Sequence, residues 1–324
     1  MDTIPALRVG LLTCARYCHT PPIWGPIIQP ESAPEEARLK TRTTRLRLAQ
    51  VWDLDAAAAR RFAAQYGATA VSHYADMVGK VDAVILDDFD SCLHFPHLAR
   101  PYLEAGLPMF INRPFALSMP DAVELVDTAR AHGAPLMTGS SFEFAPEVEG
   151  IRRQVEACGP IHGYVAANSM SDYPTHGIHG LLFVHACMGG GVRRVAYQTR
   201  DWHEPNGLVT IEHEGRDGGR PFYGVVQEIT GTWGWIRVFG GSSFEQAVGS
   251  GPYFWLALLV EMQRFFETRQ MPQSYDDILE KTAMFLAGFR SHLDAGGAPV
   301  DLDQLGDWRA PLLKPDPYPE GFFA

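Results

Sequence analysis

The chain of 324 residues is 46% hydrophobic and 20% charged, the composition of an ordinary globular protein with room for two cores. Its formal net charge of −11 argues against binding nucleic acid or an anionic membrane by general electrostatics. The start of the chain lacks the basic region and apolar core of a signal peptide, and no segment is long and apolar enough to span a bilayer. Five scattered cysteines favour a reduced, cytoplasmic protein.

The N-terminal part of the chain alternates apolar runs with helical segments. Residues 7–12, 46–52 and 81–86 are typical of buried strands. Asp55 precedes an alanine-rich segment and is expected to cap a helix. Asp53, at the end of the second strand, is a candidate to bind the ribose hydroxyls of an adenine nucleotide, with helix capping as the alternative. A carboxylate at this position repels a 2′-phosphate and therefore favours NAD over NADP.

The segment 107–118 organises this half of the chain. Its apolar run ends in Asn112, Arg113 and Pro114, and Ser118 is expected to cap the following helix. In an open α/β sheet, ligands bind beyond the carboxyl ends of the strands. Asn112 and Arg113 are therefore expected to point into a site.

This strand, the Asn-Arg-Pro corner, the helix after it and residues 134–139 together resemble the Gfo/Idh/MocA family of nicotinamide-dependent sugar oxidoreductases. In that family the corner reads Glu-Lys-Pro, and the lysine donates and accepts a proton beside the nicotinamide. The resemblance runs from about residue 7 to residue 302. It implies an α/β fold with an N-terminal Rossmann-type parallel sheet domain and a C-terminal α/β domain with an open, mainly antiparallel sheet. It also implies a cis Arg113–Pro114 peptide.

The nucleotide-binding turn departs from the family pattern. Family members carry Gly-x-Gly where Thr13 and Ala15 stand, and no glycine lies between Gly10 and Gly25. A threonine hydroxyl can still donate to a phosphate, and alanine is the smallest replacement for glycine. Thr13, Cys14 and Ala15 are therefore the candidates to contact the pyrophosphate, and NAD is the expected cofactor.

The second half of the chain contains repeated strand patterns separated by glycine-containing turns, at residues 192–200, 208–214, 222–230 and 233–239. Two long helices are expected after them, at residues 253–268 and 274–295.

Three parts are expected along the chain. Residues 1–139 form the Rossmann-type domain, residues 140–305 a domain for substrate binding and oligomerisation, and residues 306–324 an extended tail. A homo-oligomer is expected to form through the sheet of the second domain.

The stretch that begins at Asp172 holds the residues best suited to chemistry. The family pattern Asp-x-Gly-x-His places a substrate-binding aspartate and a catalytic histidine before a helix. Gly177 and His179 match it, and Thr175 occupies the aspartate position. A histidine can take a hydroxyl proton near neutral pH while hydride leaves the carbon. His179 is the expected base, and Asp172 and His176 are further candidates; two ordinary histidines opening a helix are the alternative.

Arg113 and Asn112 alter the chemistry of the corner. Arginine stays charged, so Arg113 is expected to bind and polarise a hydroxyl, carbonyl or carboxylate and not to shuttle protons. Asn112 lacks the negative charge of the family's glutamate. Glu143 stands where a further family stretch carries an arginine.

The expected function is NAD-linked oxidation or reduction of a sugar, cyclitol or related polyhydroxylated small molecule. Two other classes stay open because signature residues are altered: a redox-silent lyase, isomerase or hydrolase, and a non-catalytic sensor or partner subunit. No metal is expected. By ligand type, a metal set as a minority hypothesis would consist of Glu143, Asp172, His176 and His179.

Overall fold

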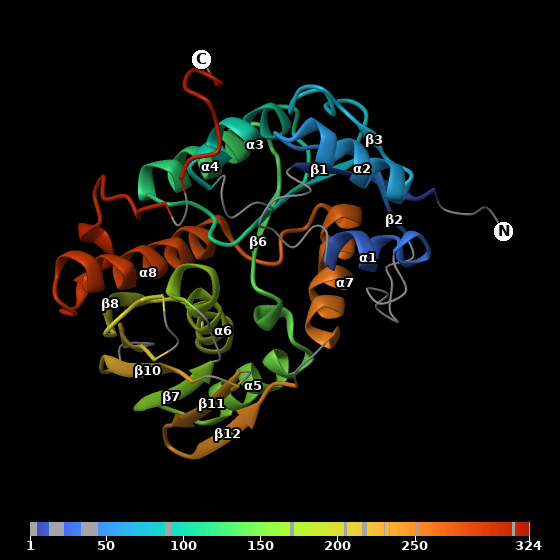
Figure 1. Ribbon diagram of the computed structural model, residues 1–324. Helices are drawn as coiled ribbons and strands as arrows, with labels where there is room; N and C mark the ends of the chain where they lie inside the picture. The colour runs from blue at the N-terminus through green and yellow to red at the C-terminus, as the bar shows by residue number, and fades with distance from the viewer. Residues whose placement is uncertain are drawn as a thin grey trace.

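The computed structural model describes residues 5–12, 23–33, 45–87, 92–168, 172–203, 206–215, 219–229, 231–232, 234–249, 252–312 and 315–323. They form a six-stranded sheet and a seven-stranded sheet at opposite ends of the molecule, with helices around and between them (Figure 1).

The N-terminal sheet is parallel throughout and has the strand order β3-β2-β1-β4-β5-β6. Its strands are β1 Leu7–Leu12, β2 Leu46–Trp52, β3 Thr69–Ala70, β4 Ala83–Leu86, β5 Met109–Asn112 and β6 Leu136–Gly139. Every residue of β4, β5 and β6 is buried, because helices cover both faces of a parallel sheet. This strand order is that of dinucleotide-binding Rossmann folds, and its ligand crevice lies beyond the carboxyl ends of β1 and β4.

The helices of this part are α1 Gly25–Ile28, α2 Ala56–Tyr66, α3 Phe95–Glu104 and α4 Met119–Ala131. The carboxylate of Asp55 accepts hydrogen bonds from two backbone N–H groups in the first turn of α2, and the Ser118 hydroxyl accepts one in α4. Both predicted caps are therefore confirmed. Gly67 ends α2 with φ of 66°, a left-handed conformation that glycine adopts without strain.

The second sheet has the order β12-β11-β7-β10-β9-β8-β13, and only its β7–β10 pair is parallel. Its strands are β7 Gly163–Asn168, β8 Val192–Gln198, β9 Leu208–His213, β10 Phe222–Glu228, β11 Trp235–Phe239, β12 Ser243–Ala247 and β13 Val300–Asp301. The predicted fold class is confirmed. The edge strands β12 and β13 were not predicted, because one carries few apolar residues and the other is two residues long.

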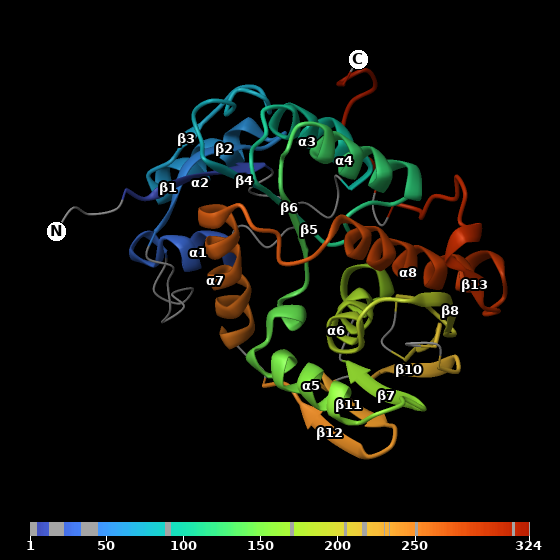
Figure 2. The same ribbon diagram turned by 180° about the vertical axis from the view of Figure 1, so that it is seen from behind.

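One face of the second sheet is covered by helices. The helical elements after β6 are η5 Ser141–Phe144, α5 Pro146–Ala157, η6 Tyr173–Gly177, α6 Ile178–Met188, α7 Pro252–Thr268, α8 Tyr275–Asp294 and η8 Leu302–Gln304. Nearly every residue of α6 is buried, as expected for a helix that is apolar on all sides. Helix α8 lies between α4 and strand β8, so it joins the two halves of the molecule (Figure 2).

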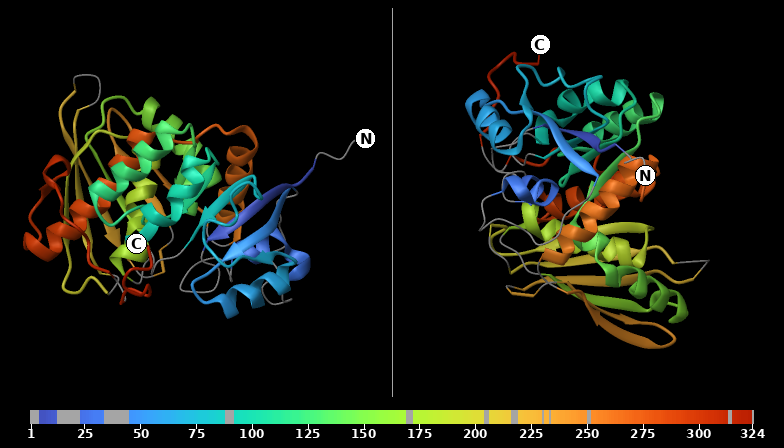
Figure 3. Two further views of the ribbon diagram at one scale, coloured as in Figure 1. Left: turned by 90° about the horizontal axis from the view of Figure 1, so that it is seen from above. Right: turned by 90° about the vertical axis from the view of Figure 1, so that its right-hand side faces the viewer.

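Helix α7 packs against the N-terminal sheet although it comes late in the chain (Figure 3). Leu258, Met262 and Phe265 are fully or almost fully buried in one apolar cluster with Val9 and Leu11 of β1. The N-terminal core is therefore completed by a segment more than 240 residues away in sequence from β1.

The C-terminal segment returns to the N-terminal part of the molecule, near α3 and α4 (Figure 1). Asp316 accepts a hydrogen bond at 2.8 Å from a ring nitrogen of His94, and Phe323 stacks on His94 and His97. Among the described residues, no helix combines the length and apolar character needed to cross a membrane.

Candidate active site

The corner after β5 is buried and is linked to β4. Asn112 and Arg113 are each 3% exposed, and Asp87, directly after β4, is fully buried. Asn112 donates from Nδ2 to Oδ1 of Asp87 at 2.5 Å and accepts at Oδ1 from Nη1 of Arg113 at 3.4 Å. Asn112 thus connects the Asp87 carboxyl group to the guanidinium. The Arg113–Pro114 peptide is cis, as predicted.

His179 lies against Arg113, although the two are 66 positions apart in sequence. Nη2 of Arg113 is 2.7 Å from Nε2 of His179, and Nε is 3.1 Å from the same atom. On the other side of the ring, Nδ1 lies 2.5 Å from the hydroxyl oxygen of Ser140, directly after β6. His179 is 5% exposed, and the ring of Phe142 packs against it with centroids 5.3 Å apart.

These contacts orient the imidazole. A guanidinium has only N–H donors, so Nε2 of His179 accepts from Arg113 and carries no proton. Nδ1 faces the Ser140 hydroxyl at 2.5 Å, and Nε of Arg113 is 3.3 Å from the same ring atom. The lone pair of Nε2 on His179 therefore faces Arg113.

Asp172 caps the π-helical turn η6, and His176 lies within that turn. The Asp172 carboxylate accepts from the backbone N–H and the hydroxyl of Thr175 at 2.6–2.7 Å, and Nδ1 of His176 is 3.4 Å away from it. Burial by itself would raise the pKa of Asp172, but the hydrogen bonds from His176 and Thr175 outweigh it and lower this pKa. Asp172 therefore carries a negative charge next to Thr175, the residue at the family's aspartate position. The ring centroid of His176 is 6.0 Å from that of His179.

Asp53 lies at the carboxyl end of β2 and is 2% exposed. Its Oδ1 accepts from the backbone N–H of Asp55 at 2.7 Å, so one oxygen stabilises the turn into α2. The ribose-binding role of Asp53 stays a prediction. Thr13, Cys14 and Ala15, the candidates for the pyrophosphate, lie outside the described residues.

Comparison with known proteins gives a family. Residues 31–140 match the family model GFO_IDH_MocA, described as an oxidoreductase family with an NAD-binding Rossmann fold. Residues 31–140 are therefore similar to the NAD-binding Rossmann domain of this oxidoreductase family. The match bears out the predicted resemblance, with the oxidoreductase class and NAD as the cofactor of that class. No curated protein matches the sequence.

Solved structures that include myo-inositol dehydrogenases share the fold over nearly the whole chain. The myo-inositol dehydrogenase from Lactobacillus casei, solved in complex with NAD(H) and myo-inositol, is 14% identical with a TM-score of 0.73, and 91% of this chain covers 96% of that one. GenD2 from gentamicin A biosynthesis, in complex with NAD, is 18% identical with a TM-score of 0.70, and the match covers 93% of this chain and 97% of GenD2. The myo-inositol 2-dehydrogenase from Lactobacillus plantarum is 14% identical with a TM-score of 0.70 and coverage of 91% and 99%. At these identities the likeness is one of fold.

Glu143 forms a buried ion pair. Its Oε1 lies 2.6 Å from Nζ of Lys281 on α8, and the two side chains are 6% and 3% exposed. Its Oε2 accepts from the backbone N–H of Ser140 at 2.6 Å, which completes a capping box at η5. Burial raises the pKa of the Glu143 carboxyl, although the charge of Lys281 opposes this effect. The pair therefore holds Ser140, the hydrogen-bond partner of His179.

The metal set considered from ligand type is wrong. Glu143 is engaged by Lys281, and no group of three or more His, Cys, Asp or Glu side chains in the described part of the chain is placed to hold a metal ion.

Three residues of the site were missed by sequence reasoning: Asp87, Ser140 and Lys281. Lys281 falls on the apolar side of α8 between Ile278 and Phe285, both buried. A lysine in that position of an amphipathic pattern signals a buried charge that requires a partner.

Proposed function

We propose that this protein is an NAD-linked oxidoreductase acting on a sugar, cyclitol or similarly polyhydroxylated small molecule. The observation that carries the proposal is the contact between Arg113 and His179 at the carboxyl end of β5. It places a guanidinium and an imidazole at the edge of a Rossmann sheet where ligands bind. Oxidation of a secondary alcohol uses such a pair, because the hydroxyl must be oriented and must lose its proton.

The described residues at the carboxyl end of β2 are suited to bind an adenine nucleotide. Asp53 has the acceptor oxygens that a ribose diol requires, and it lies at the end of the strand next to β1. We infer that Asp53 and Asn112 contact the cofactor, and we keep Thr13, Cys14 and Ala15 as the candidates to contact the pyrophosphate. Bound NAD⁺ supplies a hydride acceptor.

Residues of the chain bind the substrate, accept its proton and orient the imidazole. Arg113 binds the substrate oxygen by donating hydrogen bonds to it, and its positive charge stabilises negative charge that develops there. Nε2 of His179 accepts the hydroxyl proton once the guanidinium has turned from the ring to the substrate. Ser140 keeps the imidazole oriented through Nδ1. Asp172 and His176 flank the site and are assigned to binding substrate hydroxyls.

The first experiment is mass spectrometry of gently purified protein, which asks whether a nicotinamide nucleotide or a metal comes with it. A panel of polyols that includes myo-inositol and glucose is then assayed for absorbance of the reduced nicotinamide. Formation of NADH with one substrate class supports the proposal. Absence of NAD and NADP binding at millimolar concentration would contradict it.

A redox-silent lyase, isomerase or hydrolase is the second candidate. It is favoured by one observation: Arg113 replaces the family's lysine, and its guanidinium occupies the lone pair of the histidine. Conversion of a substrate without net formation of NADH would identify this class.

We also propose that the chain forms a homo-oligomer through the face of the second sheet that none of the described helices covers. Strand pairing places Val165, Tyr223 and Phe239 on this face, where they are 39%, 57% and 39% exposed. Apolar side chains gathered on one uncovered face are typical of an interface. Tyr223→Glu is expected to shift the mass measured by light scattering toward the monomer, and an unchanged mass would contradict this interface.

We retain two further assignments as proposals. The two sheets support domain limits of 1–139 and 140–305 with a tail over 306–324. Cytoplasmic localisation is supported by Cys158 and Cys187, which are buried free thiols.

A further inference from the structure

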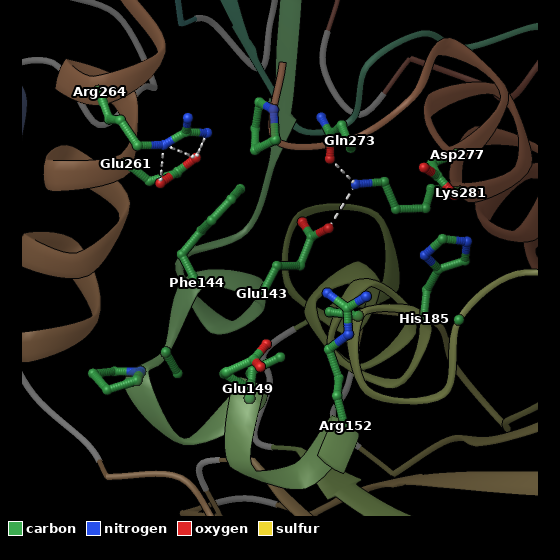
Figure 4. A pocket seen from close by; sticks show the side chains of 16 residues that line it. Glu143, Phe144, Glu149, Arg152, His185, Glu261, Arg264, Gln273, Asp277 and Lys281 are labelled. Atoms are coloured by element: carbon green, nitrogen blue, oxygen red, sulfur yellow. Dashed lines mark hydrogen bonds and ion pairs between the residues drawn. The ribbon is translucent and has the colours of Figure 1, made fainter. Parts of the chain in front are cut away.

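A cavity of about 500 Å³ lies between α5, the end of α6, α7 and the start of α8 (Figure 4). Lys281 and Glu143 form its inner wall, and Arg152, His185 and Arg264 line the sides. The volume is in the range of small-molecule sites, roughly 300–1,000 Å³.

This cavity is separate from the proposed active site. Neither Arg113 nor His179 lines it. Lys281 stands between the two regions, because it also lines a narrow void beside Arg113 on the other side. A molecule in the cavity would therefore touch the far side of the Glu143–Lys281 pair.

The carboxylates around the cavity already have partners. Glu143 pairs with Lys281, and Glu261 accepts from Nε of Arg264 at 2.9 Å. The other two also have donors: Glu149 pairs with Arg153 at 3.1 Å, and Asp277 accepts from the backbone N–H of Ser274 at 2.8 Å.

Arg152 differs from these groups. Its guanidinium points from α5 into the cavity (Figure 4), and no carboxylate in the described part of the chain lies within ion-pair distance of it. His185, 6% exposed, stays neutral near pH 7, because burial and the charge of Lys281 lower its pKa to about 4. The cavity thus offers one uncompensated cation and a neutral imidazole.

We propose that this cavity is a second binding site, for a small organic anion whose carboxylate or phosphate group pairs with Arg152. A guanidinium takes either group in a bidentate arrangement. Hydroxyl groups on the same molecule have His185 and Glu149 as partners. The proposal does not depend on the reaction carried out at Arg113 and His179.

Calorimetric titration of the full chain tests the proposal with glucuronate as the carboxylate probe, glucose 6-phosphate as the phosphate probe and glucose as the neutral control. At least one anion is expected to bind more tightly than glucose, and the tighter one assigns the anionic group. Arg152→Gln should weaken that binding by about tenfold or more, the usual effect of removing a charge-assisted hydrogen bond.

Arg153→Gln is the matched control, because Arg153 is the next residue on α5 and already pairs with Glu149. It should leave the affinity unchanged, as should Arg113→Gln. The proposal is overturned if Arg152→Gln binds as the native protein does, if neither anion binds more tightly than glucose at millimolar concentration, or if Arg113→Gln abolishes the binding.

Discussion

Arg113 donates to Nε2 of His179 at 2.7 Å, so the cation of the corner and the proposed base hold each other in the described structure. The lone pair that would accept a substrate proton is occupied by the guanidinium. Substrate binding must therefore separate the two side chains, with the substrate hydroxyl replacing one Arg113–His179 hydrogen bond.

The first prediction concerns His179. His179→Ala is expected to lower turnover by about 10²–10⁴-fold, the usual contribution of a positioned general base. Steady-state kinetics would measure this on the substrate found in the polyol panel. His176→Ala is the control, because that ring contacts Asp172 and Thr175, and turnover should fall by a smaller factor. Near-normal turnover of His179→Ala together with complete loss in Arg113→Ala would show that the roles are assigned wrongly.

The second prediction concerns Arg113. Arg113→Ala should mainly raise the Michaelis constant, because a fixed cation orients the substrate. Arg113→Lys keeps the charge and restores the family's residue but not its glutamate partner, so only partial activity is expected. A Lys variant as active as the native protein would indicate that the bidentate guanidinium is not used.

The third prediction concerns cofactor choice. If Asp53 meets the ribose diol, NAD should bind more tightly than NADP, and Asp53→Ala should narrow the difference. Asp53→Asn is the more informative variant, because its amide oxygen can still accept from the N–H of Asp55 while the charge is removed. Fluorescence titration with both cofactors measures the ratio of affinities. Equal affinities in the native protein would contradict this role of Asp53.

The fourth prediction concerns the Glu143–Lys281 pair. Glu143→Gln leaves a charged lysine that is 3% exposed, so the free energy of unfolding should fall by about 3–5 kcal/mol, as for a broken buried ion pair. The double variant Glu143→Gln with Lys281→Met should recover most of this loss, because no buried charge remains. Urea unfolding measures the free energy of unfolding of the native protein, the single variant and the double variant.

Glu149→Gln provides the control for this comparison. Glu149 pairs with Arg153 at the surface, where ion pairs contribute little to stability. The free energy of unfolding of Glu149→Gln should therefore be close to that of the native protein. If the double variant Glu143→Gln with Lys281→Met is as unstable as Glu143→Gln, the lost side-chain packing, and not the buried charge, accounts for the lost stability.

The fifth prediction concerns Glu228 on β10, which is 4% exposed. One of its oxygens accepts from the Tyr197 hydroxyl at 3.1 Å and from the backbone N–H of Gly207 at 2.9 Å, and burial raises its pKa to about 7. From pH 4.5 to about pH 7 the native state holds a proton that the unfolded chain has released, so stability falls as pH rises through this window. The expected contribution is about 1–3 kcal/mol.

Glu228→Gln should remove the fall in stability between pH 4.5 and about pH 7. The measurement is the difference between the native protein and the variant in unfolding free energy across pH, because His185 acts in the opposite sense. The lowered pKa of His185, about 4, makes stability rise with pH up to its ordinary value of 6.5. Identical pH dependence in the two proteins would contradict the assignment to Glu228.

The sequence alone determined the features that depend on neighbours along the chain. The parallel strands follow from short apolar runs, because a strand buried on both faces has no polar side. The caps by Asp55 and Ser118 follow from side chains that reach the backbone two or three residues ahead. The position of Arg113 at a strand end follows from the apolar run directly before Asn112 and Arg113.

Only the tertiary structure decided the contacts that join distant segments. Helix α7 entered the N-terminal core, and Lys281 met Glu143, because apolar faces were buried together across more than a hundred residues of intervening chain. The same packing brought His179 to Arg113. A residue pattern records which faces are apolar but not which faces meet, so the orientation of the lone pair on His179 became known only when its neighbours were in place.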